Sequence, residues 1–73
     1  MNYELPNGRI LYVTACLEEI GYATHYSYIN DKGEITPKRY KSFELPVRTT
    51  LDEAQADLDV FADKKGLKKV GVI

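Results

Sequence analysis

Residues 46–66, PVRTTLDEAQADLDVFADKKG, constrain the fold most, because they carry both the start and the stop signals of one helix. Thr50 and Glu53 have the T-x-x-E spacing of a capping box. Gly66 stands where a left-handed C-cap belongs. Acidic residues fill the first half and two lysines end it, which suits the helix dipole. We therefore predict a helix over about 50–65.

This helix has a single narrow apolar stripe. The residues that follow the i, i+3, i+4 rhythm are Leu51, Ala54, Leu58, Phe61 and Lys65. On the sheet side we expect Leu11, Val13, Ile29 and Phe43 to be buried against the stripe. One helix can cover only one face of a sheet, so the other face must meet water, a partner or a second copy.

The remaining segments predict β-strands rich in β-branched and aromatic residues. They are NYEL, RILYVTACL, YATHYSYI, KRYKSFEL and LKKVGVI, joined by turns at PNG, Gly21 and NDKG. A helical turn over 17–20 stays open as an alternative. Pro37 cannot donate to a ladder, so the fourth strand should start at an edge or irregularly. We predict one α+β domain over 1–73: a small antiparallel sheet of three to five strands, one C-terminal helix on one face, and a short final strand.

The strand YATHYSYI separates large from small side chains. Tyr22, Tyr26 and Tyr28 share one face, and Ala23 and Ser27 share the other. Small residues are what a sheet needs where a helix backbone comes close. We therefore predict that the tyrosines lie on the face away from the helix. Tyr12 and Tyr40 are their candidate neighbours in that row.

The chain offers little catalytic chemistry. Its one histidine, His25, and its one cysteine, Cys16, cannot make a four-ligand zinc site. Glu18 and Glu19 are adjacent, which on a strand sends them to opposite faces. There is no glycine-rich phosphate loop. We expect a protein that is not an enzyme and that binds no cofactor, metal or small-molecule ligand.

Charge and cysteine content suggest the compartment and the partners. The net charge of −1 gives no general attraction to nucleic acid or to an anionic membrane. The charges are nevertheless segregated: residues 51–63 hold five acids and no base, and residues 64–69 hold four lysines. A single thiol and a start that is unlike a signal peptide favour a reducing cytoplasm, and we expect no membrane association.

Part of the pattern resembles two families of DNA-binding domain. GYATHYSYINDKGE, KRYKSF and TTLDEAQADLDVFA, together covering residues 21–62, are similar to the arm-binding domain of tyrosine-recombinase integrases and to the plant ethylene-response-factor type of domain. These families lay an open sheet face in the major groove. The resemblance implies DNA contacts from Tyr26, Tyr28, Lys38, Arg39 and Lys41.

Two functions are therefore expected. The first is an interaction domain that binds a protein partner, or a second copy as a homodimer, through an open tyrosine-rich sheet face, since tyrosine is enriched at interfaces. The alternative is nucleic-acid binding through the same face and its basic cluster. The candidate binding surface comprises Tyr22, Tyr26, Tyr28, Lys38, Arg39, Tyr40 and Lys41.

Overall fold

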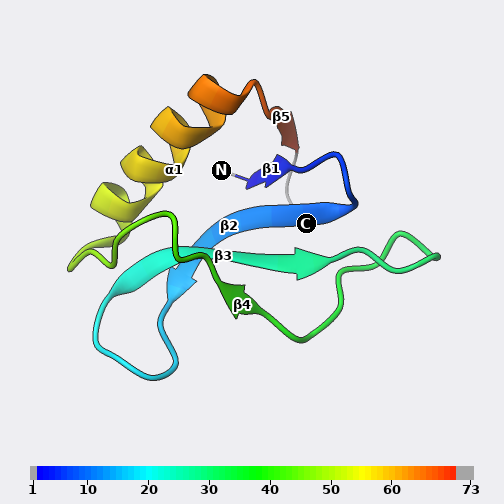
Figure 1. Cartoon of the computed structure of the whole chain (residues 1–73). Helices are drawn as coiled ribbons and strands as arrows, with labels where there is room; N and C mark the ends of the chain where they lie inside the picture. The colour runs from blue at the N-terminus through cyan, green and yellow to red at the C-terminus, as the bar shows by residue number, and fades with distance from the viewer. Residues whose placement is uncertain (1, 71–73) are drawn as a thin grey trace.

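The computed structural model describes residues 2–70 and has the predicted α+β architecture. Its elements are β1 (Asn2–Glu4), β2 (Arg9–Ala15), β3 (Tyr22–Tyr28), β4 (Tyr40–Lys41), α1 (Leu51–Lys65) and β5 (Lys68–Val70). The five strands form one antiparallel sheet in the order β4-β3-β2-β1-β5. Figure 1 shows α1 on one side of this sheet, with β4 at the edge far from the helix. The predicted final strand runs on into residues 71–73, which lie outside the described part of the chain.

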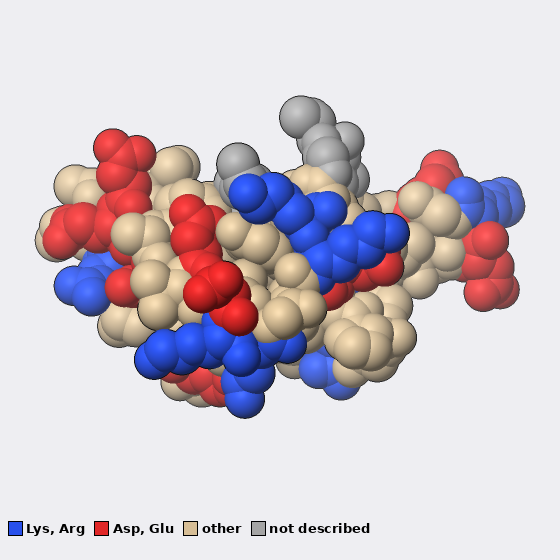
Figure 2. All heavy atoms as spheres, turned by 90° about the horizontal axis from the view of Figure 1, so that it is seen from above, with Lys and Arg blue, Asp and Glu red and all other residues tan. Residues whose placement is uncertain are grey.

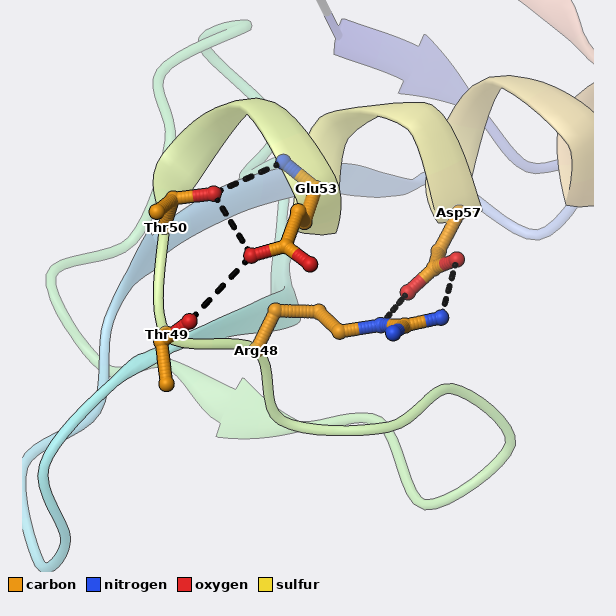
Figure 3. Close-up of polar contacts among 5 residues, drawn as sticks. All are labelled: Arg48, Thr49, Thr50, Glu53 and Asp57. Atoms are coloured by element: carbon orange, nitrogen blue, oxygen red, sulfur yellow. Dashed lines mark hydrogen bonds and ion pairs between the residues drawn. The ribbon is translucent and has the colours of Figure 1, made fainter.

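The helix begins and ends where its capping residues predict. The Thr50 hydroxyl accepts a hydrogen bond from the Glu53 backbone N–H at 3.2 Å and donates one to the Glu53 carboxylate at 2.9 Å. Arg48 makes a two-pronged ion pair with Asp57 at 2.7 and 3.2 Å, and this pair attaches the incoming chain to the second turn (Figure 3). Gly66 ends the helix with φ of 65°. The part of the chain that the structure describes holds no helix long and apolar enough to cross a membrane.

The core lies between α1 and the centre of the sheet. Tyr3, Leu11, Leu58 and Ala62 form its buried cluster, and Val13 packs beside them. The predicted stripe is correct at Ala54 and Leu58, which are both buried. It is only partly correct at Phe61, which is half-buried and packs at the rim of the cluster.

Three core predictions were wrong. Leu51 is about half exposed at the first residue of α1. Phe43 is exposed because β4 ends at Lys41, so no strand pairing orients its side chain inward. Ile29 is only half-buried and stands outside the core cluster, at an isolated bridge beyond the end of β3.

The prediction that the tyrosines face away from the helix was also wrong. Directly opposed residues in an antiparallel pair point to the same face, and Tyr26 lies opposite Leu11 in the register of β3 against β2. Leu11 belongs to the buried cluster that includes Leu58 of the helix, and Tyr26 packs against that cluster. The tyrosine row of β3 therefore shares the helix face of the sheet.

The small residues of β3 accommodate side chains rather than a helix. On the helix-free face, the Arg39 guanidinium donates to Thr14 Oγ1 and to the Ala15 carbonyl on β2, so this side chain crosses over β3. Ser27 Oγ donates to the Lys38 carbonyl at 3.1 Å. Ala23 and Ser27 are fully buried on this face because longer groups fold over them.

Candidate interaction surface

Three of the predicted tyrosines form one cluster at the outer end of the sheet. Tyr26 and Tyr40 lie opposite each other on β3 and β4, and their rings stack with centroids 5.3 Å apart. Tyr28 meets both rings edge-on, at 6.1 Å from Tyr26 and 6.0 Å from Tyr40. We call Tyr26, Tyr28 and Tyr40 the tyrosine cluster. Such offset and edge-to-face pairs are the favoured aromatic geometries.

Two cations border the cluster. The Arg9 guanidinium carbon lies 5.1 Å from the Tyr26 ring centroid and 5.3 Å from that of Tyr28, and Lys38 Nζ lies 5.4 Å from the Tyr40 centroid. Tyr28 is 40% exposed, while the other two rings are half-buried. The arrangement is a partly exposed aromatic platform with positive charge at its edges. It suits contact with an apolar or anionic surface.

The structure separates the other predicted site residues from this cluster. Lys41 lies opposite His25 and pairs with Glu19, which places it on the helix-free face. Arg39 crosses that same face toward Thr14. The predicted basic cluster of Lys38, Arg39 and Lys41 therefore divides between the two faces of the sheet.

Tyr22 and Tyr12 also stand apart. Tyr22 is on the helix face, but it begins β3 and its backbone pairs with Arg48 at the other end of the strand. Tyr12 is on the opposite face, where its hydroxyl lies 2.6 Å from Ser27 Oγ. Tyr12 was therefore wrongly predicted as a neighbour of the tyrosine row.

Arg9 is the site residue that the sequence interpretation missed. It begins β2 and lies opposite Tyr28 in the ladder. The β2–β3 hairpin could have indicated Arg9, because a register that pairs Leu11 with Tyr26 also pairs Arg9 with Tyr28. That register depends on the length of the 16–21 loop, which the sequence pattern does not specify.

His25 is a buried histidine on the helix-free face. Its Nδ1 lies 3.0 Å from the Ala23 carbonyl. Burial lowers the pKa of His25, the hydrogen bond to Ala23 opposes that effect, and the nearby charges of Arg39 and Lys41 lower the pKa further. The imidazole is thus held against a backbone carbonyl, with the cations Arg39 and Lys41 close by.

The expected segregation of surface charge is interrupted where Arg48 pairs with Asp57 of the acidic helix stretch. Figure 2 shows acidic and basic side chains beside one another over the face that is seen from above. Among residues 2–70, no three His, Cys, Asp or Glu side chains are grouped so that they could hold a metal ion. No protein-family model, curated protein or solved structure matches this chain.

Proposed function

We propose that this chain is a small non-enzymatic interaction domain that binds a protein partner through the tyrosine cluster. The observation that supports this most is the set of three stacked rings bordered by Arg9 and Lys38. Tyrosine and arginine are the residue types most enriched at interface hot spots, where large contact area combines with a polar handle. The two cations favour a partner that presents carboxylates beside apolar side chains.

The division of the basic residues favours a protein partner over nucleic acid. A phosphate backbone is bound by several cations along one surface, whereas Lys41 pairs with Glu19 and lies on the face opposite Lys38. The free thiol of Cys16 suits a reducing compartment such as the cytoplasm. Nucleic-acid binding remains the competing outcome of the test.

The test compares Tyr28→Ala and Arg9→Gln with the wild-type chain. Partners captured by the wild type are identified and purified, and their affinities for each variant are then measured by calorimetry. Both variants should lose about tenfold or more in affinity while keeping the wild-type melting temperature, since Tyr28 is partly exposed. Ile20→Ala is the matched control, because Ile20 is a fully exposed apolar residue that makes no contact with the cluster rings.

The nucleic-acid alternative is tested with oligonucleotides. Single-stranded and duplex DNA are titrated at low salt and followed by fluorescence anisotropy. Tight binding that Tyr28→Ala or Lys38→Gln weakens, with a salt slope that falls by about one unit per lost phosphate contact, would replace the protein-partner proposal by the nucleic-acid one.

A further inference from the structure

The structure has a second candidate surface, at the β4 edge of the sheet, lined by residues of both sheet faces. A hollow of about 390 Å³ lies between the loop after β2 and the strand β4. Leu17 and Phe43 stand at its wall although they are 76% and 92% exposed. Two large apolar side chains that are exposed beside the same hollow give it an apolar rim that a partner could cover.

The charges of this hollow are self-complementary. Glu18 and Arg39 both line it, and neither forms an ion pair within the described residues. The Arg39 guanidinium reaches only neutral acceptors, Thr14 Oγ1 and the Ala15 carbonyl, and its buried Nε has no hydrogen-bond partner. One surface therefore carries an unpaired anion, an unpaired cation, an apolar protrusion and a cavity.

We propose that this hollow binds a second copy of the chain in a two-fold symmetric dimer. In such an interface the same patch meets itself, so each feature must find its complement within the patch. Phe43 of each copy enters the hollow of the other, and Glu18 of each copy pairs with Arg39 of the other. A 73-residue chain also has a small core of its own, and dimerisation adds apolar burial. The hollow adjoins the tyrosine cluster, because Tyr26 and Tyr40 also line it, whereas Tyr28 and Arg9, the residues varied in the partner test, do not.

Sedimentation equilibrium over a concentration series tests the apolar half of the proposal. The wild-type chain should pass from monomer to dimer as its concentration rises. Phe43→Ala should weaken association by about tenfold or more, whereas the control Ile20→Ala, on the same loop as Leu17 but outside the hollow, should leave it unchanged. A wild-type chain that stays monomeric up to about 1 mM overturns the proposal, and so does a dimer that Phe43→Ala does not weaken.

Charge exchange tests the symmetry. Glu18→Arg and Arg39→Glu should each lower self-association by about tenfold or more, because each variant places like charges opposite one another. Mixing the two variants should restore a heterodimer, since the introduced arginine then meets the introduced glutamate while Arg39 of one chain meets Glu18 of the other. Restoration also shows that both variants fold. If each variant melts like the wild type and the mixture stays monomeric, the two-fold pairing is wrong.

The two proposals can fail separately. Loss of dimerisation in Phe43→Ala with unchanged partner affinity would leave the tyrosine cluster proposal intact. Loss of partner affinity in Tyr28→Ala with an unchanged dimer would leave the hollow proposal intact. A single variant that removes both activities at a wild-type melting temperature would contradict their independence.

Discussion

Thr24 is a buried hydroxyl without a hydrogen-bond partner. It lies opposite Val13 on the helix face, is 1% exposed, and its Oγ1 contacts no donor or acceptor in the described chain. Thr24→Val keeps the shape and removes the unsatisfied group, so it should raise the free energy of unfolding by about 1 kcal/mol. Urea denaturation measures this. Thr14→Val is the matched control and should give no gain, because Thr14 Oγ1 accepts from Arg39.

His25 should make stability fall in mild acid. Its pKa is lowered in the folded state mainly by burial, so the unfolded chain takes up the proton first, at its ordinary pKa of about 6.5. The stability contributed by the neutral imidazole is therefore complete above that value and decreases as pH falls toward the folded pKa. Comparing urea denaturation of the wild type and His25→Gln from pH 7.5 to 5 isolates the effect, since the variant does not titrate there. If the free energies of unfolding of the wild type and of His25→Gln changed with pH in parallel, His25 would not be the cause of the acid sensitivity.

At the scale of elements, the C-terminal end of α1 requires a left-handed backbone conformation at Gly66. Gly66 has φ of 65°, and a Cβ added there would meet no atom within 4 Å. Gly66→Ala should therefore cost about 1 kcal/mol through backbone strain alone, and Gly66→Asn should cost less because asparagine tolerates this region. Gly21→Ala should cost more, since its Cβ would lie 2.7 Å from the Arg48 carbonyl oxygen. Equal melting temperatures for the Gly66 and Gly21 variants would refute this ordering.

The inner face of α1 depends on Leu58 more than on Phe61. Leu58 is fully buried in the core cluster, whereas Phe61 is half-buried at its rim with Lys65 Nζ 5.9 Å from its ring centroid. Leu58→Ala should cost about 3 kcal/mol or more, and Phe61→Ala should cost less than that. Chemical denaturation of the two variants under identical conditions checks the order. A larger loss at Phe61 would place the centre of the core elsewhere on the helix.

The sequence predicted the helix better than the strands, and the reason is local. Thr50, Glu53 and Gly66 act within a few residues, so capping signals are visible in the sequence alone. The extent of β4 is not a local property. The strand β4 comprises Tyr40 and Lys41, although the predicted strand reached residue 45. Beyond it, backbone contacts with β3 are isolated, from Ser42 to Thr24 and from Arg48 to Tyr22.

At the scale of the whole molecule, alternation predicted which side chains share a face but not which face the helix covers. The tyrosines of β3 are on one face, as expected. That face is the one that α1 covers, because Tyr26 pairs with Leu11, which is buried against the helix. The pairing of these two residues is a long-range property. The small residues Ala23 and Ser27 were predicted to face the helix, and this was wrong, because they are buried on the opposite face. The group that covers them is the side chain of Arg39, the residue before β4, and no sequence periodicity indicates this contact.

A hydrogen bond between β1 and α1 should be sensitive to acid. The Tyr3 hydroxyl on β1 donates to Asp59 Oδ1 on α1 at 2.7 Å, and this bond raises the pKa of Tyr3. Burial alone would raise the pKa of Asp59, but hydrogen bonds from Tyr3 and Gln55 outweigh it and the pKa is lowered. The stability contributed by the carboxylate is therefore complete above its ordinary pKa of about 3.9 and is lost as pH falls through the lower folded value.

Tyr3→Phe should accordingly cost about 1.5–3 kcal/mol at neutral pH, the range for a hydrogen bond to a charged group, and less near pH 3. Tyr12→Phe is the matched control, because its hydroxyl bonds the neutral Ser27 and its cost should not vary with pH. Urea denaturation of both variants and the wild type at the two pH values measures the difference. If Tyr3→Phe lowered the free energy of unfolding equally at both pH values, the hydrogen bond to the ionised Asp59 carboxylate would not be what Tyr3 contributes to stability.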